Sequence, residues 1–180
     1  MTSARQALID HLGAHAFRSD GPFTLASGQT ADWYIDARQT TFSGEGAQAV
    51  AAAIMEVLDE EVKALGGMTM GADPIAVATA ALSAGALDAF SIRKADKDHG
   101  TGGRLVGPVE PGTPVAIVED TTTTGTAFLD AVDVAIEAGL RVVQTVSLFD
   151  RSSGVVSEKM VERGLPYTAL VGPGDLGVEG

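Results

Sequence analysis

The chain has 180 residues, with 24 acidic and 12 basic side chains, a net charge of −12 and no cysteine. This length suits one ordinary domain with a buried core, so we expect residues 1–180 to form a single domain. The lack of cysteine excludes disulfides, thiolate metal ligands and cysteine nucleophiles, and it is compatible with a cytoplasmic protein. The negative charge argues against binding to nucleic acid or to an anionic membrane, because both need a positive field. We expect neither a secretory signal nor a membrane span, since the start lacks a basic segment followed by an apolar core and the longest nearly uncharged run, Pro74 to Leu87, is too short.

The N-terminal third predicts helices separated by short strands. Apolar periodicity indicates one helix from Ala4 to Ala14 and a longer one from Glu45 to about Val62. Between them, Phe23 to Leu25 and Trp33 to Ala37 are typical of short strands. We expect roughly the first 40 residues to form a small hood, the N-terminal hood, over the rest of the protein.

The remainder of the chain predicts strands that alternate with helices, after a break at Gly66-Gly67. The expected strands are Met68–Met70, Ala89–Arg93, Val115–Val118, Arg141–Phe149 and Tyr167–Val171. The expected helices are Pro74–Ala84, Gly125 to about Ala138, and Val155–Gly164. Such alternation predicts an α/β fold with a central parallel sheet flanked by helices, and ligands at the carboxyl edge of the sheet.

The most informative segment follows the expected strand Val115–Val118. It reads Glu119, Asp120, Thr121, Thr122, Thr123, Thr124, Gly125, Thr126 and Ala127. The first turn of a helix offers unpaired N–H groups and the positive end of its dipole, which favour a phosphate. Carboxylates repel phosphate, so the two acids are expected to bind the hydroxyls of a sugar whose phosphate lies in the turn. The segment therefore predicts a sugar-phosphate site.

Other interpretations of this segment need comparison. A threonine-rich turn can serve only as a helix cap, and the turn alone does not decide between a cap and a binding site. A Walker-type nucleotide loop requires a lysine after the glycine, where this chain has Thr126. A dinucleotide fold lacks its fingerprint, because no GxGxxG follows a strand.

The order of buried strand, paired acids, hydroxyl-rich turn and glycine resembles the phosphoribosyl-diphosphate (PRPP) motif of type I phosphoribosyltransferases. The resemblance implies that this chain has the type I phosphoribosyltransferase fold, a central parallel sheet flanked by helices with a small N-terminal hood. It also implies that Glu119 and Asp120 bind the ribose hydroxyls, and that Thr121 to Ala127 hold the 5′-phosphate.

A basic loop from Arg93 to Arg104 holds four of the twelve Lys and Arg residues. Alone it is more typical of a solvated loop of mixed charge than of a binding site, but beside a sugar-phosphate site it indicates an anionic partner. Its pattern Arg-Lys-x-x-Lys-x-His-Gly resembles the catalytic loop of orotate phosphoribosyltransferases. The resemblance implies that the loop serves the neighbouring subunit of a homodimer, and that Mg²⁺ arrives with the substrate rather than in a protein-only cage. The residues implied to neutralise the departing pyrophosphate are Arg93, Lys94, Lys97 and His99.

Three further segments are similar to the same family. They are Phe23-Thr24-Leu25-Ala26-Ser27-Gly28, Trp33-Tyr34-Ile35-Asp36 and Phe149-Asp150-Arg151. The resemblance implies that Arg151 binds the orotate carboxylate, a contact that suits a planar guanidinium. The other implied orotate contacts are Ser27, Gly28, Tyr34 and Thr123.

The implied activity is transfer of the phosphoribosyl group from PRPP to orotate in pyrimidine biosynthesis, with no nucleic acid or membrane as partner. Two departures concern lysines, since Ala26 and the segment Gly71-Ala72-Asp73-Pro74 stand where many relatives carry one. Two alternatives remain. A purine-specific enzyme would have no carboxylate for Arg151 to bind, and a regulatory RNA-binding relative would need a basic patch.

Overall fold

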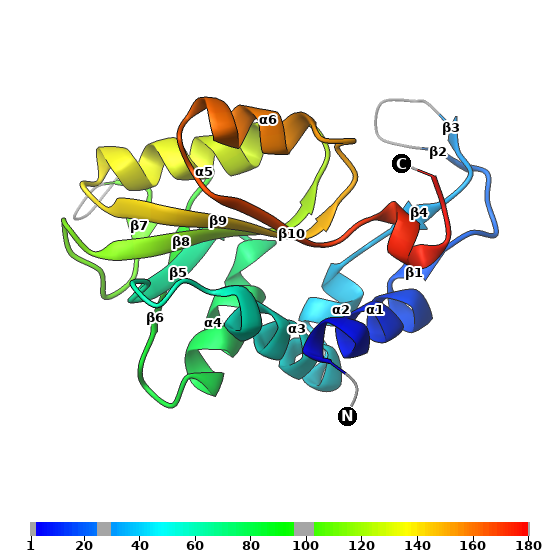
Figure 1. Ribbon diagram of the computed structural model, residues 1–180, viewed down its shortest axis with the longest axis horizontal. Helices are drawn as coiled ribbons and strands as arrows, with labels where there is room; N and C mark the ends of the chain where they lie inside the picture. Colours follow the sequence, from blue (N-terminus) through cyan, green and yellow to red (C-terminus); the bar gives the residue numbers. More distant parts are fainter. Residues whose placement is uncertain (1–2, 25–29, 96–102, 180) are drawn as a thin grey trace.

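The computed structural model describes residues 3–24, 30–95 and 103–179. A six-stranded sheet lies between two layers of helices (Figure 1). The strand order is β10-β9-β8-β5-β6-β7, and neighbouring strands run parallel except for the antiparallel pair of β6 and β7. The strands are β5 Ala64–Met68, β6 Asp88–Ile92, β7 Leu105–Val106, β8 Pro114–Thr122, β9 Arg141–Asp150 and β10 Tyr167–Val171. The predicted α/β fold with a mostly parallel sheet is confirmed.

Helices cover both faces of this sheet. In Figure 1, α5 and α6 lie on one face, and α1, α3 and α4 lie on the other. The helices are α1 Ala4–His15, α2 Arg38–Thr41, α3 Gly44–Val57, α4 Ala72–Leu82, α5 Thr126–Glu137 and α6 Val155–Glu162, with a 3-10 turn η1 Pro173–Leu176. Among the described residues, no helix combines the length and the apolar composition needed to cross a membrane.

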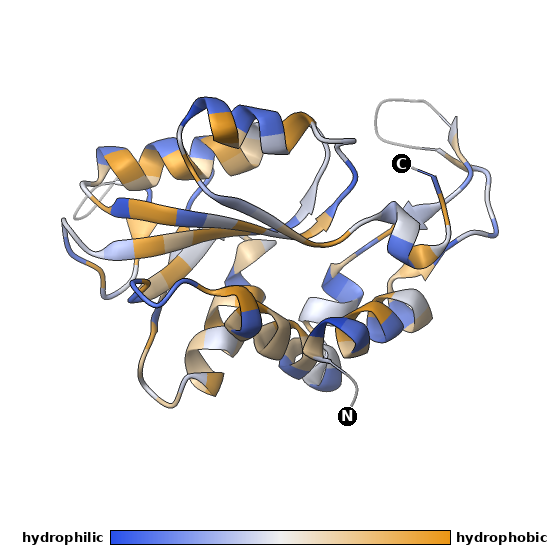
Figure 2. Ribbon diagram, in the orientation of Figure 1, coloured by the Kyte–Doolittle hydropathy of each residue, from blue (hydrophilic) through white to orange (hydrophobic). Residues whose placement is uncertain are grey.

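The central strand β8 is apolar on both faces because helices pack on both. Ala116 and Val118 join the core formed with α3 and α4, whereas Val115 and Ile117 join the core formed with α5. All four side chains are fully buried. Figure 2 shows the same arrangement as hydrophobic positions that recur along the strands, and as helices α5 and α6 with mixed faces. Burial on both faces explains the nearly continuous apolar run that predicted this strand.

The described part of the N-terminal hood consists of α1, two small antiparallel strand pairs and the start of α2. These pairs are β1 Phe17–Arg18 with β4 Tyr34–Ile35, and β2 Phe23–Thr24 with β3 Thr30–Ala31. Figure 1 shows them at one end of the molecule, beside the C-terminal segment. Arg5 joins the two regions: its Nη2 lies 2.7 Å from a carboxylate oxygen of Asp175, and its Nε donates to the carbonyl of Leu170 at 2.8 Å.

The expected bounds of two elements around Gly66-Gly67 are wrong. Helix α3 ends at Val57, and the glycines lie inside β5 rather than at a break. A Cβ added at Gly66 would lie 2.2 Å from the carbonyl oxygen of Phe90, and one added at Gly67 would lie 2.1 Å from that of Val118. The glycines therefore allow close packing within the sheet, which a local pattern reads as a turn.

The bounds of β8 and of the basic loop also differ from expectation. Strand β8 continues to Thr122, so the acid pair lies within the strand instead of after it. Thr121 and Thr122 pair with Phe149 and Asp150 of β9. The polar loop, expected to run on from the basic segment to Val109, is interrupted by β7, which pairs with β6.

Candidate active site

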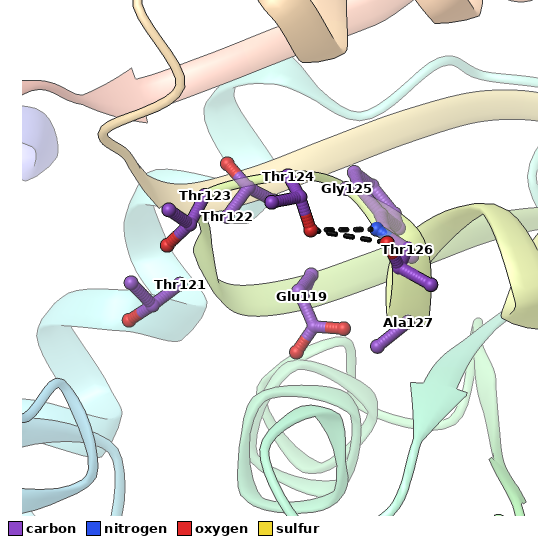
Figure 3. A pocket seen from close by; sticks show the side chains of 9 residues that line it. Glu119, Thr121, Thr122, Thr123, Thr124, Gly125, Thr126 and Ala127 are labelled. Atoms are coloured by element: carbon purple, nitrogen blue, oxygen red, sulfur yellow. Dashed lines mark hydrogen bonds between the residues drawn. The ribbon is translucent and has the colours of Figure 1, made fainter. Parts of the chain in front are cut away.

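A cavity opens at the carboxyl end of β8, where the chain turns into α5 (Figure 3). It is lined by Glu119 and by Thr121 to Phe128. Gly125 begins the helix with a φ of +75°, a conformation that favours glycine, and a Cβ there would also lie 2.9 Å from Val156. The turn can therefore bend tightly around the cavity only with glycine at this position.

The N-terminus of α5 lies open to this cavity. No side chain caps the helix at Gly125, and its first turn contains no acidic residue. The hydroxyls of Thr124 and Thr126 lie 3.0 Å apart, and Figure 3 shows them pointing toward each other across the turn. Uncapped N–H groups, the helix dipole and adjacent hydroxyls together form a site suited to a phosphate group.

The acid pair lies at the floor of the same site. Glu119 is 7% exposed, and its Oε1 accepts a hydrogen bond from the backbone N–H of Asp120 at 3.2 Å. Its Oε2 is buried and has no hydrogen-bond partner among the described residues. Burial raises the pKa of Glu119 to about 8, reinforced by the negative charge of Asp120 and opposed by the positive charge of Lys94. At neutral pH Glu119 is therefore largely protonated, which lessens the repulsion of a nearby phosphate.

Gly71, in the turn between β5 and α4, makes room for this acid pair. A Cβ at Gly71 would lie 2.7 Å from Cγ of Asp120. On the other side, Oδ1 of Asp120 accepts a hydrogen bond from the N–H of Thr121 at 2.6 Å. Gly71 had no role predicted from the sequence, because only the packing of β5 beside β8 brings it to the carboxylate.

A second cavity adjoins the first above the acid pair. It is lined by Arg38, Met68, Thr69, Met70, Gly71, Lys94, Glu119, Asp120 and Ala127. Two cations thus face two acids, and the turn of Thr69 to Gly71 forms one wall. Arg38, which comes from the start of α2, was not among the residues predicted from the sequence.

The described ends of the basic loop are joined to each other and to α5. The N–H of Arg93 donates to the carbonyl of Arg104 at 2.8 Å, and Nε of Arg104 donates to the carbonyl of Arg93 at 2.7 Å. Arg104 also forms an ion pair with Asp130 of α5 through both terminal nitrogens. These contacts hold the base of the loop, while Lys94 lines the second cavity.

Arg151 follows β9 directly and lies over an aromatic ring of the hood. Its Cζ is 4.2 Å from the centroid of the Trp33 ring, and desolvation lowers its pKa. Trp33 is in turn packed edge-on against Phe149, and its Nε1 donates to the carbonyl of Glu179 at 3.2 Å. Among the described residues, Arg151 has no carboxylate partner.

A partly buried polar network joins the carboxyl ends of β8 and β9 to the first residue of β10 through Asp150. Its Oδ1 accepts from the hydroxyl of Thr122 at 2.9 Å and from the N–H of Ser152 at 2.7 Å, and its Oδ2 accepts from Tyr167 at 2.8 Å. Burial raises the pKa of Asp150, but these hydrogen bonds outweigh that effect and the pKa lies below its usual value. The N–H of Arg151 donates to the carbonyl of Thr122 at 3.0 Å. The network therefore fixes Arg151 relative to the threonine turn.

The predicted residues are only partly gathered in these cavities. Glu119 and the segment Thr121 to Ala127 line the first cavity, and Asp120 and Lys94 line the second. Tyr34 lines neither; its ring lies 5.9 Å from that of Phe23 in the hood. Four predicted site residues lie outside the described part of the chain, namely Ser27, Gly28, Lys97 and His99.

The donor atoms of the site suit a metal ion that brings its own ligands. Among the described residues, no group of three or more His, Cys, Asp or Glu side chains could hold a metal ion. The unpartnered Oε2 of Glu119, the carboxylate of Asp120 and the threonine hydroxyls are all oxygen donors, which Mg²⁺ prefers. These residues fit Mg²⁺ as a companion of a phosphorylated substrate rather than as an ion held by protein alone.

The doubly covered parallel sheet, the acid pair near the end of β8 and the open turn before α5 define a type I phosphoribosyltransferase. No family model matches the chain. A relative from Streptomyces coelicolor, orotate phosphoribosyltransferase, is 39% identical over 183 residues, which cover 99% of this chain and 100% of the relative. The chain belongs to the orotate phosphoribosyltransferase family.

Solved structures of the Mycobacterium tuberculosis orotate phosphoribosyltransferase are similar throughout. The complex with inorganic phosphate matches with a TM-score of 0.87 and 31% identity, over 98% of this chain and 100% of that one. The complex with PRPP matches with a TM-score of 0.82 and 30% identity, over 97% of this chain and 99% of that one. The similarity therefore includes the sheet and the helices that surround the two cavities.

Proposed function

We propose that this protein transfers the 5-phosphoribosyl group from PRPP to N1 of orotate, giving orotidine 5′-phosphate and pyrophosphate for pyrimidine synthesis. The observation that carries this proposal is the position of Arg151. Its guanidinium lacks a carboxylate partner among the described residues, and its backbone is bonded to Thr122 at the edge of the phosphate-type cavity. A sugar phosphate and a carboxylated base then lie side by side.

The 5′-phosphate and the ribose of PRPP use different parts of the site. The open N-terminus of α5 and the hydroxyls of Thr121 to Thr124 and Thr126 bind the 5′-phosphate. Glu119 and Asp120 bind the ribose 2′ and 3′ hydroxyls. The raised pKa of Glu119, about 8 in the unliganded site, favours the protonated carboxyl, which can donate as well as accept a hydrogen bond.

Chemistry takes place at the ribose C1 atom. The bond from C1 to the pyrophosphate oxygen breaks, the bond from N1 of orotate to C1 forms, and the N1 proton passes to solvent. The transition state is expected to resemble an oxocarbenium ion, so positioning and electrostatics matter more than a strong base. Mg²⁺ bound with PRPP would neutralise part of the charge of the leaving group.

The base and the loop complete the site. Arg151 binds the orotate carboxylate, and Thr123, Tyr34, Ser27 and Gly28 surround the ring. Arg93, Lys94, Lys97 and His99 bind the leaving group and exclude water when the loop closes. We assign this loop to the partner's site in a homodimer.

The proposed function also implies a domain organisation for the chain. Residues 1–180 act as one phosphoribosyltransferase domain, with about residues 1–40 as its hood. One core cluster supports this, because it combines Leu8 of α1 with Leu170 of β10 and Ile54 of α3. We place the enzyme in the cytoplasm, where pyrimidine precursors are made.

The test is a base panel with purified protein, PRPP and Mg²⁺. Orotate absorbance should fall only when both PRPP and Mg²⁺ are present, while uracil, hypoxanthine and adenine should be consumed far more slowly. Preferential use of a purine would assign the enzyme to another base. Binding of PRPP without consumption of any base would instead indicate a regulatory member of the family.

A further inference from the structure

The start of α2 places an arginine above the acid pair, at a position that the sequence resemblance left without a role. Arg38 lines the second cavity together with Lys94, the turn of Thr69 to Gly71 and both acids. We propose that Arg38 is a ligand of the pyrophosphate group of PRPP. This inference rests on the proposed function and adds a residue from the hood to the leaving-group site.

Arg38 is held in place by an aspartate of the hood. Its Nε lies 2.7 Å from Oδ1 of Asp36, and Oδ2 of Asp36 accepts a further hydrogen bond from Gln39 at 3.2 Å. Among the described residues, no hydrogen bond uses the terminal Nη1 and Nη2 groups of Arg38. The guanidinium is thus oriented by one nitrogen and keeps its two outer nitrogens for a ligand. Two parallel N–H donors match the oxygens of a phosphate group.

The small number of positive charges around the second cavity also favours a role for Arg38 in binding pyrophosphate. Asp120 and Glu119 lie at its floor, and the turn of Thr69 to Gly71 contributes no basic side chain. Ala26 and Asp73 stand where many relatives carry a lysine, so the positive charge must come from other elements. Arg38 and Lys94 are the two described cations that line the cavity. A highly charged leaving group then meets one cation from the hood and one from the base of the basic loop.

Arg38 also lies close enough to Asp120 for that charge to affect its pKa. Its hydrogen bond to Asp36 raises its pKa, and the charges of Asp36 and, more weakly, Asp120 add to this effect. A purely structural role would be to neutralise Asp120. The two roles differ in which fragment of PRPP they affect, because Asp120 belongs to the ribose side and the pyrophosphate to the other.

The test compares Arg38→Gln with Arg141→Gln in the full chain. Arg141 is the first residue of β9, at the amino ends of the strands and far from the carboxyl ends that form the site. It forms an ion pair with Glu61, and its side chain is 55% exposed against 48% for Arg38. Calorimetry measures binding of pyrophosphate with Mg²⁺ and, separately, of ribose 5-phosphate. Loss of a charged hydrogen-bonding pair predicts that Arg38→Gln weakens pyrophosphate binding roughly 10- to 100-fold. Ribose 5-phosphate binding should change by less than about twofold, and Arg141→Gln should match the wild type.

Kinetics separate this inference from the proposed function. In Arg38→Gln the KM for PRPP should rise while the KM for orotate stays near the wild-type value, and Arg38→Lys should recover part of the loss. Unchanged pyrophosphate binding, or equal losses for both fragments, would overturn the role of Arg38. A wild-type protein that binds the fragments but consumes no orotate would instead refute the proposed function. If Arg38→Gln melts far below the wild type, Arg38→Lys carries the same comparison, since it keeps the charge and loses the paired donors.

Discussion

The sheet-borne part and the hood-borne part of the candidate site are built in different ways. Glu119 and Thr122 are 7% and 2% exposed, and they lie on a nine-residue strand that pairs with β5 over Val115–Ile117 and with β9 as far as Thr122. The hood supplies Tyr34 from a two-residue strand, with 37% exposure, and Arg38 from a four-residue helix. Rigid positioning of the sugar phosphate is therefore combined with a more lightly supported wall around the base and the leaving group. Substitutions in the two regions should therefore change different kinetic constants.

The largest expected effect concerns the sheet side. Gly71→Ala places a methyl group against the Asp120 carboxylate, where a Cβ would lie 2.7 Å from Cγ. Displacement of a positioned group by about 1 Å costs about 100-fold in rate, so kcat/KM for PRPP should fall by roughly that factor. Gly44→Ala is the matched control, because nothing lies within 4 Å of a Cβ there. Full activity of Gly71→Ala would show that the acid pair tolerates movement.

The second prediction concerns the boundary between the two regions. Arg151→Gln removes a charged donor, so the KM for orotate should rise roughly 10- to 100-fold while the KM for PRPP changes by less than about twofold. Its preference for orotate over uracil should shrink by a similar factor. Arg163→Gln, which breaks a surface ion pair with Asp133, serves as the control. A parallel rise in the KM for PRPP would mean that Arg151 supports the turn rather than the base.

A smaller effect is expected from the hood itself. Trp33→Leu removes the ring beneath Arg151, and a cation–π contact of about 0.5–2 kcal/mol predicts a rise of roughly 2- to 30-fold in the KM for orotate. Trp33→Phe should recover most of the loss, because it keeps an aromatic face. Trp33 is the single tryptophan of the chain, so its fluorescence should respond to orotate in the wild type and much less in Arg151→Gln. Equal behaviour of the Leu and Phe variants would rule out the ring stacking as the cause.

The smallest effect concerns stability, and it tests the burial of Glu119 without an activity measurement. Glu119 has a pKa of about 8 in the folded state against an ordinary value of 4.5, so the folded protein binds this proton more tightly than the unfolded chain. Its contribution to stability is therefore fully present below pH 4.5 and is lost as the pH rises from there through about 8. Glu119→Gln carries no such proton, and at pH 9 its Tm should exceed that of the wild type by about 2–5 °C. A constant difference between pH 6 and pH 9 would contradict the raised pKa.

Sequence patterns were most informative where one physical rule acts alone. Strand β10 has the predicted bounds Tyr167–Val171, because its apolar run is bounded by turn residues on both sides. Hydrophobicity ends β8 at Val118, yet pairing with β9 carries the strand through the polar residues to Thr122. Local patterns cannot detect pairing between residues distant in sequence.

The candidate site shows the same division. The acid pair and the threonine turn are contiguous in sequence, and their order alone indicated a sugar phosphate. Gly71 and Arg38 have no such signal, since each reaches the site from another element through tertiary packing. Trp33 belongs to a segment that resembles the family, but its contact with Arg151 also depends on tertiary packing. The pair Asp36 and Arg38, two residues apart and opposite in charge, was the only local clue, and such pairs are common on surfaces.

The bond between Arg151 N–H and the carbonyl of Thr122 has a consequence for substrate geometry. It joins the residue proposed to bind the base to the turn proposed to bind the phosphate through main-chain atoms alone. This bond fixes the backbone of Arg151 relative to that of Thr122, and the Trp33 ring, 4.2 Å from Cζ of Arg151, limits where the guanidinium can lie. Under the proposed function, only a base whose carboxylate and attacking nitrogen are separated as in orotate can reach the ribose carbon while its carboxylate meets the guanidinium. An isomeric pyrimidine carboxylate, with the acid group moved by one ring position, should bind as an inhibitor without being ribosylated.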